Sequence, residues 1–276
     1  MAKGVLVDIT RCVGCGSCVV ACKMWNKLKH DKETPALGKN AALAAENWTA
    51  VKLVETSGTG NGGEDKVWRF VKNQCLHCEE PACASACFSR AIVKTQEGAV
   101  VYNVDLCVGC RYCMLACPFS IPKYEWDKVF PRVRKCQMCP ERVQKGDLPA
   151  CAGVCPADAL TFGDRNSLLK QARERIGGGG YINHIYGEKE AGGTAWLYIS
   201  DVPFEKLGFR TNVTTTPLPH YSESVLRLTP AVGLGWGALL TGIYVYNRRR
   251  NDIAREETEM RISAGKGKSR KGGSRK

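Results

Sequence analysis

Two segments in the first half of the chain alternate apolar and polar residues in the way that predicts antiparallel hairpins. Residues 48–56 (WTAVKLVET) and 66–72 (KVWRFVK) flank the stretch SGTGNGGED, whose glycines favour a turn. Residues 91–103 (AIVKTQEGAVVYN) show the same alternation on both sides of Gly98. We therefore expect one long hairpin and one short hairpin in this part of the chain.

The second half contains a helical pattern followed by a strand pattern. Residues 167–176 (SLLKQARERI) predict a helix, with Asp164 or Ser167 as its N-cap and the glycines of residues 177–180 as its stop. These four glycines are interpreted as a linker, not as a nucleotide-binding loop. The run TAWLYIS at 194–200 predicts a strand. Together with the hairpins, these elements indicate an α+β fold.

An uncharged stretch near the C-terminus predicts one transmembrane helix, at residues 225–247. The 20 residues between Arg227 and Arg248 (LTPAVGLGWGALLTGIYVYN) suffice for a helix of about 30 Å, the thickness of a bilayer core. The alternative is a buried helix of a soluble protein, in which four glycines and a proline would be unfavourable. In lipid, Gly233, Gly237 and Thr241 instead form a ridge of small residues that another helix can approach closely.

Positive charge is concentrated after this stretch. The chain carries a formal net charge of +13, and residues 248–276 contribute +7, from 11 Lys or Arg and 4 Asp or Glu. Basic residues next to a membrane helix favour the cytoplasm, so we expect a basic, disordered cytoplasmic tail at 248–276. The residues before the helix then lie on the periplasmic or outer face of the cell membrane. A nucleic-acid-binding tail is the alternative, but contact with anionic membrane lipids suits a tail without aromatic platforms better.

The 16 cysteines fall into four compact groups, which we number as the first to fourth quartets. A disulfide scaffold is disfavoured, because 276 residues with 44% hydrophobic composition can bury a core without one. Structural zinc usually takes two separated cysteine pairs, which suits only the fourth quartet. In order, the quartets are Cys12, Cys15, Cys18 and Cys22; Cys75, Cys78, Cys83 and Cys87; Cys107, Cys110, Cys113 and Cys117; and Cys136, Cys139, Cys151 and Cys155.

Iron–sulfur clusters account for all four quartets. In a CxxCxxC loop, three thiolates hold three corners of a [4Fe–4S] cubane, and a cysteine further along ligates a different cluster. Pro118 and Pro156 follow the last cysteines of two quartets, as in bacterial ferredoxins, and Gly14, Gly16 and Gly109 allow the loops to wrap closely. The sequence therefore predicts four [4Fe–4S] clusters, each taking three thiolates from one quartet and one from another.

The chain resembles the four-cluster ferredoxin-like beta subunits of membrane-bound oxidoreductases, above all the formate dehydrogenase-N type. The ferredoxin-like subunits of membrane-bound nickel–iron hydrogenases are near relatives. Beside the quartets, the resemblance rests on ENWTAVKL (46–53), CRYCMLACPFSIPKY (110–124), GDLPAC (146–151) and IYGEKEAGGT (185–194). It implies two pseudo-symmetric bacterial-ferredoxin-like modules within residues 1–165, with a hairpin insertion at 26–74. It also implies an extension at 166–224 that contacts a partner.

The resemblance further implies that the first quartet shares its clusters with the fourth, and the second with the third. It assigns Cys12, Cys15, Cys18 and Cys155 to cluster A, and Cys22, Cys136, Cys139 and Cys151 to cluster B. It assigns Cys75, Cys78, Cys83 and Cys117 to cluster C, and Cys87, Cys107, Cys110 and Cys113 to cluster D.

The function implied by the resemblance is electron transfer in a respiratory complex. Electrons from formate, oxidised at a molybdenum or tungsten bis-pterin centre of a separate catalytic subunit, would pass through the clusters to a membrane cytochrome b or another quinone-reactive subunit. A nickel–iron hydrogenase or another molybdopterin oxidoreductase is the alternative partner. The chain shows no acid–base pair, nucleophile or phosphate loop, so we expect no active site of its own.

Three residues beside the quartets are candidates for adjusting the clusters. His77 could donate a hydrogen bond to a cluster, although a histidine packed beside the loop is the simpler interpretation. Arg111 and Lys135 could shift cluster potentials, but solvated charge is the default expectation for both. Since only 11 residues precede Cys12 and they contain no signal sequence, we expect export in complex with a catalytic partner that carries a twin-arginine signal.

Overall fold

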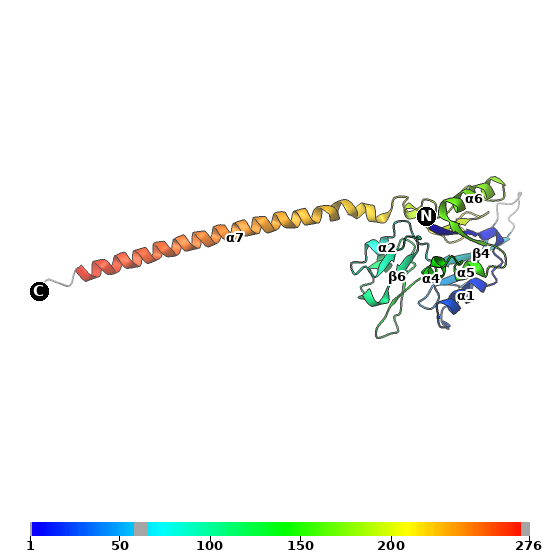
Figure 1. Cartoon of the computed structure of the whole chain (residues 1–276), viewed down its shortest axis with the longest axis horizontal. Helices are drawn as coiled ribbons and strands as arrows, with labels where there is room; N and C mark the ends of the chain where they lie inside the picture. The colour runs from blue at the N-terminus through cyan, green and yellow to red at the C-terminus, as the bar shows by residue number, and fades with distance from the viewer. Residues whose placement is uncertain (1, 58–65, 272–276) are drawn as a thin grey trace. The chain divides into compact units, whose positions relative to one another are not determined.

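The computed structural model describes residues 2–57 and 66–271 (Figure 1). The chain divides into two compact units, Met1–Tyr221 and Ser222–Lys276. The strands are β1 (Lys3–Asp8), β2 (Leu37–Gly38), β3 (Thr49–Ser57), β4 (Lys66–Gln74), β5 (Ile92–Lys94), β6 (Val100–Tyr102), β7 (Lys123–Tyr124), β8 (Val133–Arg134), β9 (Leu160–Asp164) and β10 (Trp196–Ile199). The helices are η1 (Ile9–Arg11), α1 (Ser17–Trp25), α2 (Ala82–Ser85), η2 (Val104–Leu106), α3 (Tyr112–Ala116), α4 (Pro140–Gln144), α5 (Ala150–Gly153), α6 (Arg165–Gly177), η3 (Glu190–Gly192) and α7 (Leu218–Lys271).

The first unit is organised around a three-stranded sheet in the order β10-β1-β9. Strand β1 pairs parallel with β10 and antiparallel with β9. Successive β1 side chains point to opposite faces, as the pleat requires: Val5 and Val7 join the largest apolar core, and Leu6 packs with Leu168 and Leu169 of α6. The sheet therefore separates helix α6 from the core that carries the cysteine loops.

The predicted hairpins are confirmed. Strands β3 and β4 pair antiparallel along their whole length, and β5 pairs with β6 on either side of Gly98, whose φ is +93°. Most of the predicted turn SGTGNGGED lies outside the described residues. The predicted helix and strand of the second half are also present, as α6 and β10, with Asp164 as the N-cap residue of α6.

Residues 166–221 complete the unit that holds the cysteine loops. Strand β10 supplies one edge of the central sheet, and the backbone N–H groups of Ala195 and Trp196 donate to the carbonyl of Leu76, beside the second quartet. Four aromatic residues of this segment pack against one another, and every pair except Tyr186–Phe204 is edge to face: Tyr186, Tyr198, Phe204 and Phe209. This segment therefore contributes directly to the surroundings of the thiols.

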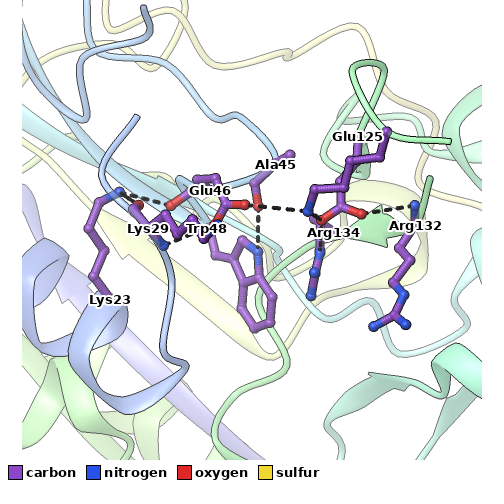
Figure 2. Close-up of polar contacts among 9 residues, drawn as sticks. Lys23, Lys29, Ala45, Glu46, Trp48, Glu125, Arg132 and Arg134 are labelled. Atoms are coloured by element: carbon purple, nitrogen blue, oxygen red, sulfur yellow. Dashed lines mark hydrogen bonds and ion pairs between the residues drawn. The ribbon is translucent and has the colours of Figure 1, made fainter. Parts of the chain in front are cut away.

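Polar contacts around Glu46 fasten the insertion to helix α1 (Figure 2). The ammonium group of Lys23, which follows Cys22, donates to the carbonyl oxygens of Lys29 and Glu46 at 2.9 Å each. The Glu46 carboxylate accepts the backbone N–H of Lys29 at 3.1 Å. The stretch ENWTAVKL thus has a structural role next to the first quartet.

A second acidic residue, Glu125, secures the β7–β8 hairpin (Figure 2). Its side chain is 1% exposed and accepts hydrogen bonds from Lys128 at 2.6 Å and from Arg134 at 2.7 Å. Burial disfavours the ionised carboxyl, but these two hydrogen bonds outweigh burial and lower the pKa of Glu125. Lys128 also lies 3.9 Å from Glu46, so the two polar groups are connected.

The C-terminal helix α7 runs without a break from Leu218 to Lys271 and contains Pro230 (Figure 1). Among the described residues, it is the one helix long and apolar enough to cross a membrane, and its large apolar side chains are exposed. Residues 248–271, which the sequence predicts to be part of a disordered tail, continue this helix in the structure. Composition favours the helix over residues 248–262, because the Arg, Glu, Ala and Met of this stretch all have high helix propensity.

Candidate iron–sulfur sites

The thiols assigned to cluster A surround one cavity. Cys12, Cys15, Cys18 and Cys155 all line it, together with backbone of the first loop and Pro156. Gly14 is required in this loop, because its φ is +69° and an added Cβ would lie 2.3 Å from the ring of Phe70 in β4. The insertion hairpin therefore closes directly over the first cysteine loop.

The thiols assigned to cluster B line a second cavity. Cys22 comes from α1, Cys151 from α5, and Cys136 and Cys139 from the loop before α4. Helices α1 and α5 lie side by side, which brings the first and fourth quartets together (Figure 1). The cavity wall also includes Trp196 of β10, which is fully buried.

The second and third quartets meet in the same way through helices α2 and α3. Cys78 lies close to Cys75, Cys83 and Cys117, the other three thiols assigned to cluster C. Burial, with a contribution from these neighbouring sulfur atoms, raises the pKa of Cys78. For cluster D, Cys113 lies close to the remaining three thiols, Cys87, Cys107 and Cys110.

The four thiol groups adjoin one another in the order A, B, C, D. Groups A and B adjoin through Cys18 and Cys151, and groups B and C through Cys136 and Cys75, which pack in one apolar cluster. Groups C and D adjoin through Cys83 and Cys113, which also share an apolar cluster. Of the 16 cysteines, only Cys15 and Cys110 are exposed, and these belong to the two terminal groups, A and D.

The buried thiols need a bound cation in order to ionise. Burial, with a contribution from neighbouring sulfur atoms, raises the pKa of Cys18 and of Cys113 to about 11, and of Cys22 and of Cys83 to about 12. Such groups ionise only when a strong positive charge reaches them, and iron supplies that charge. Backbone N–H groups also point at sulfur: Met138 donates to Cys136 at 3.4 Å.

Two buried donors near the thiols lack a protein partner among the described residues. His77 Nδ1 accepts the backbone N–H of Val100 at 2.8 Å, which assigns the ring proton to Nε2, and Nε2 has no partner. Burial, assisted by nearby Lys135 and Lys94, lowers the pKa of His77 and keeps the ring neutral. The indole N–H of Trp196, in the wall of cavity B, is also unpaired. Inorganic sulfide would accept such bonds, so both donors suit a bound cluster.

Two lysines beside the thiols are buried. Lys72 and Lys135 are each 3% exposed. The Lys135 ammonium donates to the carbonyl oxygens of Val100 and Cys136, so the expectation of solvated charge is wrong for this residue. It holds for Arg111, which is exposed and stacks 5.1 Å from the ring centre of Trp126. Lys135 comes directly after β8, and the contact of its side chain with Val100 of β6 has no signal in the local sequence.

Sequence reasoning missed Lys72 and Trp196. Burial alone would lower the pKa of Lys72, but the sulfur atoms of Cys151 and Cys18 outweigh burial and raise it. The available signal was strand periodicity, since Lys72 lies two residues after Phe70 and so on the same face of β4 as the ring that covers the first loop. Trp196 was hidden in an apolar strand that predicts only core.

Comparison with known proteins places this site in a class. Residues 66–165 and residues 11–91 each match a family described as a 4Fe-4S dicluster domain, and the two matches together contain all 16 cysteines. The class is therefore that of proteins that bind pairs of [4Fe–4S] clusters.

Relatives narrow the class. A protein of Nitratidesulfovibrio vulgaris strain Hildenborough is 45% identical over 261 residues, which cover 92% of this chain and 69% of the relative. The hydrogenase-2 operon protein HybA of Escherichia coli is 37% identical over 234 residues, covering 74% of this chain and 71% of HybA. The formate dehydrogenase-O iron–sulfur subunit of Escherichia coli is 32% identical over 244 residues, which cover 83% of this chain and 77% of that subunit. The chain belongs to the family of iron–sulfur electron-transfer subunits of formate dehydrogenase- and hydrogenase-type complexes.

Proposed function

We propose that the chain holds four [4Fe–4S] clusters in the thiol groups A to D, and that electrons cross it singly along the line A–B–C–D. The observation that carries this proposal is the unbroken series of adjoining thiol groups, whose cysteines are exposed only at Cys15 in group A and Cys110 in group D. In an electron relay, the inner clusters are buried, so that electrons do not pass to solutes, and the two terminal clusters are accessible to redox partners. The terminal groups are then the places of electron entry and exit.

The protein contributes geometry and electrostatics to this relay. A bound cluster supplies a one-electron couple, whose potential depends on hydrogen bonds to sulfur, on nearby charge and on solvent exposure. The loops fix the thiolates, the apolar walls exclude water, and the N–H groups of His77, Trp196 and Met138 are available to stabilise negative charge on sulfur. No other chemistry is required of this chain.

We further propose a molybdenum- or tungsten-containing formate dehydrogenase as the catalytic partner, and a membrane cytochrome b or another quinone-reactive subunit as the acceptor. The similarity to the formate dehydrogenase-O iron–sulfur subunit supports the donor. The apolar, exposed α7 supports a single membrane span, with the cluster unit on the periplasmic face and the basic residues after Arg248 in the cytoplasm. Contact of those basic residues with anionic lipid follows from the same orientation.

A nickel–iron hydrogenase is the second candidate partner. The similarity to HybA favours it, as does the resemblance of the stretch IYGEKEAGGT to the hydrogenase type. Both candidates use the same relay and differ only in the enzyme that feeds it.

Metal analysis of the native complex separates the two candidates. Stoichiometric molybdenum or tungsten, together with a large pterin protein, is the expected result, whereas stoichiometric nickel would replace formate dehydrogenase by hydrogenase. Protease treatment of spheroplasts tests the orientation, because it should remove the cluster unit and leave the basic end of α7 intact. Loss of that end with survival of the cluster unit would reverse the topology.

A further inference from the structure

Lys72 is a buried cation placed between two cluster sites. Its side chain lines the cavity of group A and also that of group B. It reaches this position because β4 carries it across both cysteine loops, next to Phe70, whose ring covers Gly14. The same charge therefore faces two groups of four thiols.

The ammonium group is held in place by neutral atoms. Lys72 Nζ donates to Thr49 Oγ1 at 2.6 Å and to Gln74 Oε1 at 2.8 Å, and it lies 4.6 Å from the ring centre of Trp196. Gln74 in turn donates to the hydroxyl of Tyr198, and that hydroxyl donates to the Lys72 carbonyl at 3.1 Å. This closed network fixes the charge without neutralising it.

No carboxylate pairs with Lys72 in the part of the chain that the structure describes. Burying an ammonium group without a counter-charge is strongly unfavourable. The groups that interact electrostatically with it and can become negative are the thiols of Cys18 from group A and of Cys22, Cys136 and Cys151 from group B. The counter-charge that this site lacks is the negative charge of two bound clusters.

We propose that Lys72 is the shared counter-ion of clusters A and B and raises the reduction potential of both. This inference rests on the proposed function, because it requires bound clusters. A fixed positive charge favours the more negative, reduced state of any cluster beside it, and a charge between two clusters favours an electron on either one. The insertion hairpin, which contains no cysteine, thereby gains a role in electron transfer.

The test is a redox titration of the intact complex, followed by electron paramagnetic resonance, for the wild type and Lys72→Met. Methionine keeps much of the shape of the side chain and removes the charge. Two of the four clusters should become at least tenfold harder to reduce. For a one-electron couple, this corresponds to a reduction potential that is lower by about 59 mV. The other two couples should not move. Lys52→Met is the matched control, since Lys52 lies on the same hairpin but is exposed, and it should shift none.

Unchanged potentials in fully loaded Lys72→Met, or an equal shift of all four couples, would overturn the proposal. If Lys72→Met fails to retain iron, the iron contents of Lys72→Arg and Lys72→Gln test the proposal instead. The proposal requires that Lys72→Arg retains iron and that Lys72→Gln does not. Retention of iron by Lys72→Gln but not by Lys72→Arg would contradict the proposal. Failure of the proposed function is seen separately, as fewer than four couples in the wild type before any substitution is made.

Discussion

Asp8 links the first cysteine loop to the segment after the last quartet. Substitution of Asp8 tests how much these contacts stabilise the protein around that loop. Its buried carboxylate accepts hydrogen bonds from the backbone and hydroxyl of Thr10, at 3.1 and 2.6 Å. It also accepts from Tyr181 at 2.9 Å and from Arg175 at 3.1 Å. Asp8→Ala removes these bonds four residues before Cys12.

The expected cost follows from this burial. The Asp8 side chain is 1% exposed and that of Arg175 is 24% exposed, so the substitution leaves a largely buried cation unpaired. Breaking a buried ion pair in this way costs about 3–5 kcal/mol. For a chain of this size, each kcal/mol lowers the melting temperature by roughly 2–4 °C, so the total is roughly 6–20 °C.

The assay is thermal bleaching of the iron–sulfur absorbance in the purified complex. Asp164→Asn is the matched control, because Asp164 pairs with Lys3 in the same sheet but both side chains are more than a third exposed, at 35% and 39%. Such a pair contributes at most about 1 kcal/mol, so the control should lose no more than roughly 4 °C. Equal melting temperatures for Asp8→Ala and the control would refute the reasoning.

Three further substitutions test separate parts of the account. Glu125→Gln removes a carboxyl whose pKa is lowered by Lys128 and Arg134. Such a carboxyl stabilises the fold above about pH 4.3 and loses this effect as pH falls through its folded pKa. In urea titrations, the free energy of unfolding of the wild type should therefore exceed that of Glu125→Gln at pH 7, and the difference should vanish towards pH 3. A difference that stays constant with pH would contradict the assignment. Trp196→Phe removes the unpaired indole N–H in cavity B. A redox titration should show a lower reduction potential for one cluster only. Unchanged potentials, or lower potentials of several clusters, would be the contrary result. Gly14→Ala forces a side chain against Phe70 and should remove about four irons per chain, those of cluster A, by iron analysis; full loading would show that the loop tolerates a Cβ.

The sequence predicts the local elements well because their causes are local. Alternation of apolar and polar residues identifies the β3–β4 hairpin, and Gly98 identifies the turn of the β5–β6 hairpin. Cysteine spacing alone identifies the chemistry, since the residues of a CxxCxxC loop are neighbours in the sequence as well as in space. The family resemblance, which the relatives confirm, supplies the expected pairing of the quartets, which spacing alone does not.

The remaining features depend on contacts between distant segments. Lys72 and Cys151 are 79 positions apart in the numbering, and no local pattern indicates that the lysine faces sulfur instead of water. The parallel pairing of β1 with β10, which joins residues 5 and 196, likewise has no local signal. The helical state of residues 248–271 depends on helix propensity, about which net charge carries no information.

Iron content and reducible clusters test the central claim most directly. The claim is that the 16 cysteines hold four clusters in one relay. Anaerobically purified complex should contain about sixteen irons for each copy of this chain, four per cubane, and stepwise reduction should reveal four cubane signals by electron paramagnetic resonance. The count must exclude iron of partner subunits, which variants lacking single cysteines of this chain identify. An iron content far below that number, or fewer than four reducible signals belonging to this chain, would contradict the relay.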